Sequence, residues 1–278
     1  MPELPEVEST KNVLLKIIKN TKICKVEIFN NKLRWEIKDT VKKSLTKVVL
    51  KTPYRLGKYI LIPTNTNKTI LIHLGMSGSL KIQKEKLVLL KHDHVKFTLL
   101  SEKKETIYLI YNDPRRFGFI DVTCSDEIKL HFLLRKIGID PFNKEFNHLY
   151  LIDKFKNKNV TIKSALMNQK VIAGIGNIYA NEILFLAKVH PLKKVKLIDF
   201  QTMKRLVYYI KYVLKEAIKN GGTSLKDYKS PDGKLGYFKQ KLFVYDRLGL
   251  NCLICGSQIK MLVINKRSSF ICEKCQGE

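Results

Sequence analysis

The first stretch of the chain alternates apolar and polar residues with the period of a helix. Val7, Val13, Leu14, Ile17 and Ile18 fall on one side of such a helix, and the glutamates precede the lysines along it. This order of charges suits the helix dipole, whose positive end lies at the N-terminus. The pattern predicts one amphipathic helix directly after the opening residues.

From residue 22 to about residue 122 the pattern changes to the shorter period of β-strands. A series of β-rich runs is separated by Gly, Pro and Asn residues: KICKVEIF, KYILIP, KTILIHLG, HVKFTLL, ETIYLIY and FGFIDV. Short strands divided by turn residues are typical of antiparallel folds. We therefore predict an antiparallel β-sandwich or barrel in this part of the chain.

The helical period returns after Ser125. The segment SDEIKLHFLLRKIG opens with a Ser and an Asp that suit a helix cap, so a helix is predicted there. The segment DFQTMKRLVYYIKYVLKEAIKNGG places its apolar residues on one face and ends at Gly221 and Gly222, a strong C-terminal signal. A long amphipathic helix is predicted there.

Between these segments lie a short predicted helix, a glycine-rich turn and a further helix that starts near Asn177. Gly174 and Gly176 precede that start, and neither carries a side chain that would keep a phosphate from the free amide groups of the first turn. The later segment TSLKDYKSPDGKLGYFKQ has the composition of a mobile loop that could close over a ligand. A helical domain with a phosphate-binding turn is expected.

The charge of the chain narrows the choice of partner. Its 278 residues include 52 Lys and Arg against 25 Asp and Glu, which leaves a formal net charge of +27. Such an excess attracts polyanions by releasing their counterions, so nucleic acid is the leading partner. Many lysines, such as Lys193 and Lys194, occupy ordinary surface positions. A general bias of the composition toward lysine is therefore a second explanation of the positive charge. Because 45% of the residues are hydrophobic, disorder does not explain it.

Four of the six cysteines form a metal-binding pattern near the C-terminus: Cys252, Cys255, Cys272 and Cys275. Two C-x2-C pairs at this separation favour one tetrahedral Zn²⁺ over two unrelated redox pairs. Four thiolates leave no open coordination position, so this zinc would be structural. The residues between the pairs predict a hairpin whose tip displays Lys266 and Arg267, a basic tip that suits contact with phosphate.

The remaining cysteines and the apolar runs indicate the compartment. Cys24 and Cys124 stand alone, which fits a reducing compartment better than a disulfide framework. No apolar run approaches the roughly 18 residues of a membrane span, and the N-terminus lacks the features of a signal peptide. A soluble, cytoplasmic protein is expected.

The opening letters MPELPE are the best candidate for chemistry. Removal of Met1 would leave Pro2 with a free secondary amine, which can form an iminium with a sugar aldehyde equivalent. A terminal amine with a pKa near ~7.8 is far more often unprotonated at neutral pH than a lysine with a pKa near ~10.4. Glu3 stands beside the amine and could move protons during ring opening. Glu3 and Glu6 would raise the pKa of the amine and a cation such as Lys58 would lower it, so the net shift stays open.

The same letters also suit a purely structural role. Proline and glutamate are common at helix starts, so PELPE taken alone is more typical of a capped helix than of an active site. Other motifs along the chain favour the reactive interpretation.

Ten motifs resemble one known family, in order from end to end: MPELPEVE, LGKYI, HLGMSGSL, KHDHV, NDPRRFG, IKSALMNQK, GIGNIYANE, GGTSLKDY, GYFKQKLFVYDR and the four-cysteine finger. They are similar to those of the formamidopyrimidine-DNA glycosylases. This resemblance implies a bifunctional base-excision repair enzyme that removes oxidised purines such as 8-oxoguanine and formamidopyrimidines from duplex DNA. It then implies cleavage of the abasic strand by β,δ-elimination.

The resemblance also implies an α+β multidomain architecture. Residues 1–124 would form an N-terminal catalytic β-sandwich domain with a leading helix, and residues 125–240 a helix-two-turns-helix DNA-binding domain with a capping loop. Residues 241–278 would form a β-hairpin zinc finger with one structural Zn²⁺. A monomer associated with DNA of the nucleoid, and with no membrane, is expected.

Roles of single residues follow from the same resemblance. Pro2 would attack the anomeric carbon as the Schiff-base nucleophile, and Glu3 would act as the acid. Lys58 would support β-elimination and Arg267 δ-elimination. The implied DNA contacts are His73, His92, Arg115, Lys158, Lys163 and Asn177. A wedge that fills the gap left by an extruded nucleotide would consist of Met76, Arg115 and Phe117.

Two residues depart from the family motif, and two other functions remain as alternatives. Ser164 and Asn168 stand where the family pattern leads us to expect proline and aspartate, which puts the local helix geometry in doubt. An endonuclease VIII-like glycosylase would share the Pro-Glu terminus but prefer oxidised pyrimidines, and Leu4 with HLGMSG and NDPRRFG favours the purine enzyme. A zinc-containing DNA-binding protein without catalysis is the other alternative, which the presence of Pro2, Glu3 and Lys58 disfavours.

Overall fold

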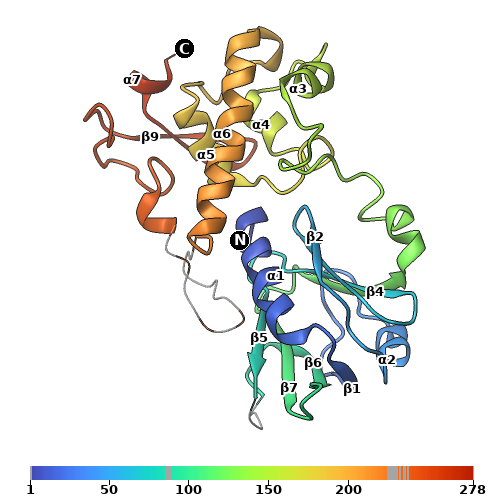
Figure 1. Ribbon diagram of the computed structural model, residues 1–278. Helices are drawn as coiled ribbons and strands as arrows, with labels where there is room; N and C mark the ends of the chain where they lie inside the picture. The colour runs from blue at the N-terminus through green and yellow to red at the C-terminus, as the bar shows by residue number, and fades with distance from the viewer. Residues whose placement is uncertain are drawn as a thin grey trace. The chain divides into compact units, whose positions relative to one another are not determined.

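The chain divides into two compact units, each formed from two segments of the sequence. In the computed structural model, residues 1–136 and 220–239 form unit 1, and residues 137–219 and 240–278 form unit 2 (Figure 1). The structure describes residues 2–84, 89–223, 231, 233, 236 and 238–277. These units are defined by their compactness, whereas the three domains predicted above were defined by function. The predicted domain boundaries at residues 124 and 240 therefore stay predictions.

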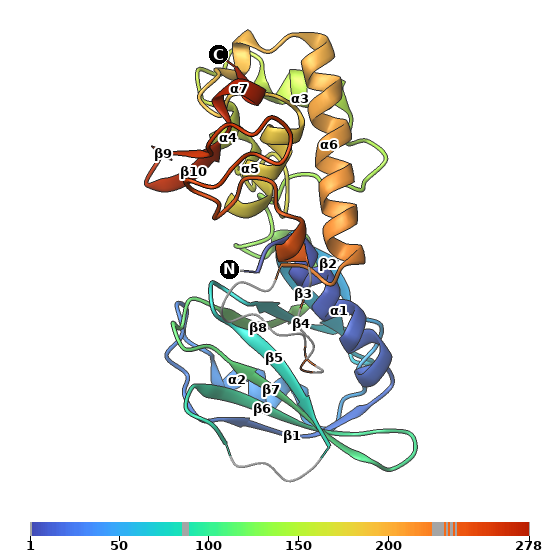
Figure 2. The same ribbon diagram turned by 90° about the vertical axis from the view of Figure 1, so that its left-hand side faces the viewer.

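Unit 1 is a sandwich of two antiparallel four-stranded sheets, as predicted (Figure 2). One sheet has, in spatial order, the strands β1 (Lys22–Ile28), β6 (Asp93–Leu100), β7 (Thr106–Asn112) and β5 (Ser79–Gln83). The other has β2 (Tyr54–Leu56), β3 (Tyr59–Pro63), β4 (Lys68–His73) and β8 (Phe119–Cys124). The strands turn alternate residues inward, as Ile107, Leu109 and Tyr111 of β7 illustrate, so both sheets share one core.

Two helices complete the core of unit 1. Helix α1 (Leu4–Ile18) buries Val7, Leu14 and Ile18, and helix α2 (Asp39–Leu45) buries Val41 and Leu45. Helix α1 therefore has the predicted apolar face. It begins at Leu4, before the first residue of the predicted stripe, because Glu3 caps it there.

The helix predicted for SDEIKLHFLLRKIG is largely wrong. Only Ser125–Leu130 are helical, as the 3-10 helix η1, and the following residues form turns. No residue of η1 is buried, and Leu130 is 74% exposed. The local cap signal was present, but a short helix gains most of its stability from packing an apolar face, and η1 buries no residue. Leu134, which is buried, lies in the turns that follow.

Unit 2 combines helices with a C-terminal hairpin. Its helical elements are α3 (His148–Phe155), α4 (Ile162–Leu166), α5 (Asn177–Leu186), η2 (Val195–Leu197), α6 (Phe200–Lys219) and α7 (Glu273–Gln276). The 3-10 helix η3 (Phe238–Lys241) crosses the boundary between the segments of the two units. The predicted short helix, glycine turn and helix at Asn177 are confirmed as α4 and α5, and the predicted long helix as α6.

The predicted hairpin is also confirmed, as strands β9 (Lys260–Ile264) and β10 (Arg267–Ile271). Lys266 lies in the turn between them with a positive φ of 61°, and Arg267 opens the second strand. An apolar cluster with Phe185, Val244 and Phe270 joins the hairpin to α5. The fold class predicted from the sequence is therefore confirmed for both units.

Two further predictions concern a loop and membrane-spanning segments. The predicted mobile loop within residues 223–240 lies mostly outside the described residues. Among the described residues, every helix is too short or too polar to cross a lipid bilayer.

Candidate functional site

The N-terminus is held in place by two carboxylates. Glu3, only 1% exposed, is the N-cap of α1, and its side chain accepts the backbone N–H of Glu6. In return the backbone N–H of Glu3 donates to Glu6 Oε2 at 2.8 Å, which completes a capping box. Glu6 Oε1 accepts the backbone N–H of Thr223 at 2.7 Å. Pro2 is buried beside this cap, so its position is fixed by the helix start.

The structure confirms the cap interpretation of PELPE, and the reactive interpretation stays a prediction. The helix cap is present, and it leaves Pro2 next to a buried carboxylate. Glu6 holds the terminus through its hydrogen bonds with the backbone N–H groups of Glu3 and Thr223.

Arg55 connects α1 to the turn that carries Lys58. Its Nε donates to Glu8 Oε2 at 2.7 Å, and its Nη1 donates to the carbonyl of Gly57 at 3.1 Å. Burial alone would raise the pKa of Glu8, but hydrogen bonds and charge from Lys11 and Arg55 outweigh it and hold that pKa below its ordinary value. Glu8 is thus a fixed negative charge that orients the Lys58 turn relative to the helix.

His73 lies at the end of β4, directly opposite Tyr59 of β3, with the two ring centroids 4.7 Å apart. Burial, then the nearby charges of Lys58 and Arg34, lower the pKa of His73 from 6.5 to about 4. Its Nδ1 accepts the backbone N–H of Gly75 at 3.0 Å, which assigns the remaining proton to Nε2. His73 is therefore a neutral hydrogen-bond donor at physiological pH.

The lowered pKa of His73 predicts a pH dependence of stability. The unfolded state binds a proton below about pH 6.5 and the folded state only below about pH 4, so folded unit 1 loses stability as the pH falls through this window. The contribution is at most about 3 kcal/mol, since one pKa unit corresponds to about 1.4 kcal/mol. Chemical unfolding of the protein and of His73→Gln between pH 7 and pH 4 measures it. The substituted protein should lose stability less steeply, and parallel curves would contradict the assignment.

The three residues of the predicted wedge come together at one end of the sandwich. Met76 is 38% exposed in the turn after β4, and Phe117 is 42% exposed in the turn before β8. The guanidinium carbon of Arg115 lies 5.1 Å from the centroid of the Phe117 ring, a cation–π contact. The end of β4 pairs with the start of β8, which brings both turns to the same edge.

His92, a further predicted DNA contact, is half-buried before β6. Its backbone carbonyl accepts the backbone N–H of Asp113 at 3.1 Å.

In unit 2 the predicted DNA contacts divide into exposed and buried residues. Lys158 is exposed after α3, whereas Lys163 of α4 is only 1% exposed. Lys163 Nζ donates to the carbonyl of Ser268 at 2.9 Å and to Ser269 Oγ. Asn177, the first residue of α5, donates from Nδ2 to the same carbonyl at 3.0 Å. Lys163 and Asn177 thus both hold strand β10, which begins with the exposed Arg267.

The two departures from the family motif are structurally explained. Ser164 Oγ accepts Asn265 Nδ2 at 2.8 Å, which adds a contact between α4 and the turn of the hairpin. Asn168 Oδ1 accepts the backbone N–H of Lys170 at 3.0 Å and stabilises the turn after α4. Helix α4 therefore forms with Ser164 within it and Asn168 in the turn after it.

The lysines of unit 2 give a matched test. Lys163→Met should lower the free energy of unfolding by about 1–3 kcal/mol, because it removes a buried, charged hydrogen-bond donor. Lys158→Met, the same change at an exposed site, should change stability by less than about 0.5 kcal/mol. Thermal unfolding of both proteins checks this, and equal stability losses would contradict the different burial of the two lysines.

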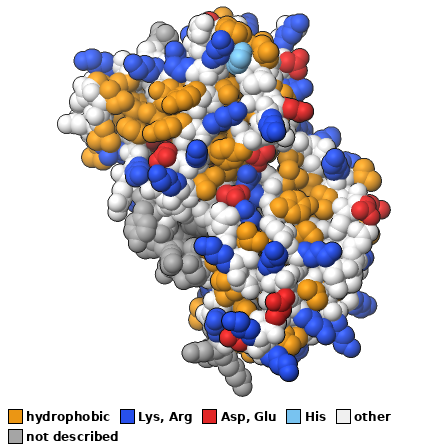
Figure 3. Space-filling model, viewed as in Figure 1, with side chains coloured by type: hydrophobic (Ala, Val, Ile, Leu, Met, Phe, Trp, Pro, Cys, Tyr) orange, Lys and Arg blue, Asp and Glu red, His pale blue; other side chains and the backbone are white. Residues whose placement is uncertain are grey.

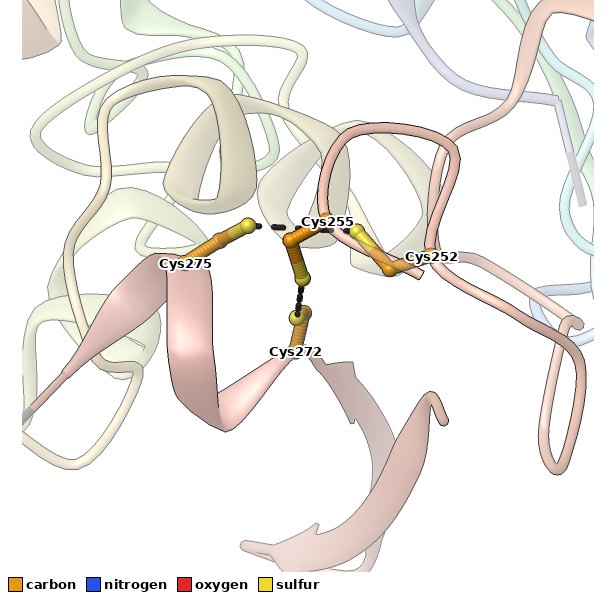
Figure 4. Close-up of side chains that lie close together, drawn as sticks. All are labelled: Cys252, Cys255, Cys272 and Cys275. Atoms are coloured by element: carbon orange, nitrogen blue, oxygen red, sulfur yellow. Dashed lines mark hydrogen bonds between the residues drawn. The ribbon is translucent and has the colours of Figure 1, made fainter. Parts of the chain in front are cut away.

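The four predicted metal ligands converge in unit 2 (Figure 4). Their sulfur atoms all lie within 4.8 Å of one another, with Cys252 and Cys275 at 3.8 Å and Cys255 and Cys272 at 3.4 Å. Cys255 and Cys275 are partly buried and the other two are buried. This four-sulfur arrangement fits one metal ion with a closed coordination shell.

Several important residues were not singled out from the sequence. Glu182 of α5 is buried and accepts the backbone N–H groups of Phe243, Val244 and Tyr245, and burial raises its pKa. A lone acid within the apolar run NIYANEILFL was the available signal. Asp113 lies within the quoted motif NDPRRFG but had been given no role.

Basic side chains accompany these features over the surface. Figure 3 shows Lys and Arg side chains spread over the displayed faces of both units, with Asp and Glu sparse among them. This distribution agrees with the net charge and favours a polyanionic partner.

Comparison with known proteins identifies the family. A model of the formamidopyrimidine-DNA glycosylase N-terminal domain matches residues 1–120, and a model of the H2TH domain of the same enzyme matches residues 137–229. The formamidopyrimidine-DNA glycosylase of Hydrogenovibrio crunogenus is 40% identical over 278 residues, which cover 100% of this chain and 97% of that protein. The chain belongs to the formamidopyrimidine-DNA glycosylase family.

Solved structures of family members agree over the full length. Wild-type Lactococcus lactis Fpg in complex with DNA containing N7-benzyl-Fapy-dG is 31% identical with a TM-score of 0.91, and the match covers 100% of both chains. The same enzyme in complex with DNA containing an abasic site is 30% identical with a TM-score of 0.91, and covers 99% of this chain and 100% of that one.

Family membership confirms the predicted enzyme class. Formamidopyrimidine-DNA glycosylases are DNA repair enzymes that combine a DNA glycosylase with a lyase for abasic sites, and this chain is such a bifunctional enzyme. The residue roles predicted above are more specific than family membership, and they stay predictions.

Proposed function

We propose that this protein excises oxidised purines, including 8-oxoguanine and formamidopyrimidines, from duplex DNA and then cleaves the abasic strand by β,δ-elimination. The observation that carries this proposal is the buried terminus, where Pro2 lies beside Glu3 at the capped start of α1. A family relative crystallised with DNA containing a Fapy-dG derivative supports the substrate class.

The first chemical step assigned to Pro2 is a displacement. The lone pair of the terminal amine forms a bond to C1′ of the damaged nucleotide, and the bond from C1′ to the base breaks with its electrons going to the base. The departing base takes up a proton. The attached nitrogen then loses its N–H proton, and its lone pair forms the iminium as the bond from C1′ to the ring oxygen O4′ breaks. The electrons of that bond go to O4′, which takes up a proton that we assign to Glu3. The resulting iminium acidifies the adjacent C2′ position, so loss of a proton there expels the 3′ phosphate.

The later steps involve cations. We assign Lys58 to β-elimination and Arg267 to δ-elimination, in which the 5′ phosphate leaves. DNA would be held by His73, His92, Arg115, Lys158, Lys163 and Asn177. The neutral state of His73 supports donation of an Nε2 hydrogen bond to phosphate, while the burial of Lys163 favours an indirect contribution through β10.

Zinc is the proposed metal of the finger. Four thiolates bonded at about 2.3 Å in a tetrahedron would have sulfur atoms about 3.8 Å apart, near the separations of the two cysteine pairs. Its role would be structural, because the four cysteines fill the coordination shell. We further propose a monomer that works on DNA in the cytoplasm.

The wedge is assigned to Met76, Arg115 and Phe117. Extruding a nucleotide leaves a gap in the stack, which apolar side chains can fill while a guanidinium offers donors to the unpaired base. The exposure of Met76 and Phe117 and the stacking of Arg115 on Phe117 support this assignment.

Product release from two oligonucleotide duplexes tests the proposal. One duplex carries 8-oxoguanine and the other thymine glycol, and each is incubated with the protein with and without borohydride. We expect faster release of 8-oxoguanine and a borohydride-trapped covalent complex. Faster release of thymine glycol would favour the endonuclease VIII-like alternative. Tight binding without trapping would show a DNA-binding protein and overturn the proposed chemistry.

A further inference from the structure

One buried carboxylate connects the two turns at the end of the unit 1 sandwich. Asp113, fully buried, follows β7. Its Oδ1 accepts Ser77 Oγ–H at 2.7 Å, and its Oδ2 accepts the backbone N–H of Gly118 at 2.8 Å. Ser77 belongs to the turn after β4, and Gly118 ends the turn before β8.

Ser77 extends the connection to the second turn. Its Oγ accepts the backbone N–H of Arg115 at 3.0 Å while its hydroxyl proton is donated to Asp113. The turn with Met76 and the turn with Arg115 and Phe117 are thereby held in one hydrogen-bond network.

Tyr111 adds a third donor to the same carboxylate. Its hydroxyl lies 3.3 Å from Asp113 Oδ2 and 3.3 Å from the carbonyl of His73. Burial, then the charge of Asp113, raise the pKa of Tyr111 well above its ordinary value, so the phenol keeps its proton. His94 Nε2 contacts the Asp113 carbonyl at 2.8 Å and fixes the backbone of the same residue.

The backbones of the two turns also approach too closely for side chains between them. A Cβ on Gly75, whose φ is +62°, would lie 2.5 Å from the carbonyl carbon of Phe117. A Cβ on Gly118 would lie 1.5 Å from the hydroxyl oxygen of Tyr111. The turns are therefore closely packed, and Asp113 accepts hydrogen bonds from Ser77, Gly118 and Tyr111 between them.

We propose that Asp113, with Ser77, is a positioning residue that locks Met76, Arg115 and Phe117 in place before DNA binds. This inference rests on the proposed function, because it presumes that these three side chains form the wedge. A wedge that is already ordered can enter the DNA stack without first losing the freedom of two separate turns. The locked network should therefore accelerate the step in which the damaged nucleotide leaves the helix.

Two substitutions weaken the network differently. Asp113→Asn keeps the shape but replaces one charged acceptor oxygen by an amide. With the amide toward Ser77, the Ser77 hydroxyl has to accept instead of donate, and the hydrogen bonds from Gly118 and Tyr111 reach a neutral oxygen and are weaker. Ser77→Ala removes the Ser77 contacts and leaves Asp113 with Gly118 and Tyr111. Asp121→Asn on β8 is the matched control, because it makes the same charge change in the same unit outside the two turns.

The test compares single-turnover cleavage on two substrates. One is a fully paired duplex with 8-oxoguanine, and the other is an abasic site in a single-nucleotide bulge, where no paired base has to be displaced. Both variants should act about 10- to 100-fold more slowly on the paired duplex, because small misplacements of positioning groups cost this much. On the bulge, the cleavage rates of both variants should stay within about 3-fold of the rate of the unsubstituted protein. The control Asp121→Asn should stay within the same range on both substrates.

The outcomes separate the two proposals. Equal slowing on both substrates by both variants would indicate general damage to the site and overturn the positioning role. Unchanged rates on the paired duplex would overturn it as well. Failure of the proposed function would differ, because the unsubstituted protein would then release no 8-oxoguanine from the paired duplex, whatever its rate on the abasic bulge, and the positioning role would fall with it.

Discussion

Pro2→Leu is expected to abolish the borohydride-trapped complex with DNA containing 8-oxoguanine. A bulky residue at position 2 keeps Met1 in place, so the terminal amine moves one residue away from Glu3 and becomes a primary amine. The buried cap around Glu3 leaves little freedom for a displaced amine to reach the same position. Trapping yield and base release, both measured on denaturing gels, should fall to background.

DNA binding should survive this substitution, because electrostatic affinity comes from the basic surface rather than from the terminus. The slope of affinity against salt concentration should be unchanged. Pro5→Ala is the matched control, since it alters the other proline of the opening segment while retaining the Pro2 amine. Normal trapping by Pro2→Leu would contradict the assignment and direct attention to Lys58.

Removal of the finger metal is expected to have the second large effect. Structural zinc sites contribute roughly 10 kcal/mol to folding, so Cys272→Ser or prolonged chelation should unfold the hairpin. Cys272 is fully buried, and its backbone N–H donates to Gln276 Oε1 at 3.0 Å. Phe185 and Phe270 pack in the same cluster, so loss of the metal should also loosen the end of α5.

Metal content by atomic spectrometry and thermal unfolding measure this effect. We expect about one zinc per chain for the unsubstituted protein, consistent with a four-cysteine site, and much less for Cys272→Ser. DNA affinity should fall, because unfolding of the hairpin removes the strand that positions Arg267. Cys24→Ser, at an exposed cysteine on β1, should change neither metal content nor stability. Full stability of metal-free protein would contradict a structural metal.

The sequence predicted those features whose cause is local or periodic. Alternation marked the strands of the sandwich, and the spacing of apolar residues marked α1 and α6, because each element needs one face for the core. The two C-x2-C pairs marked the metal cluster, since ligand spacing is a property of the chain itself. The motif series also led to the correct family.

Local signals failed where packing decided the outcome. The segment SDEIKLHFLLRKIG has a suitable cap, yet only η1 forms, and no residue of η1 is buried; the buried Leu134 is held in a turn instead of a helix. Lys163 was expected to contact DNA, and the sequence did not show that the fold buries it against a strand more than a hundred residues later, at separations of 105 and 106 residues.

The sequence by itself determined the strands, the main helices, the cysteine cluster and the strongly basic character of this protein. Only the tertiary structure decided that Glu6 holds the terminus through Thr223, that His73 is neutral, and that Asp113 joins the two turns of the proposed wedge. The reason is physical. Periodicity and ligand spacing act between near neighbours, whereas desolvation and buried hydrogen bonds depend on which distant segments the fold brings together.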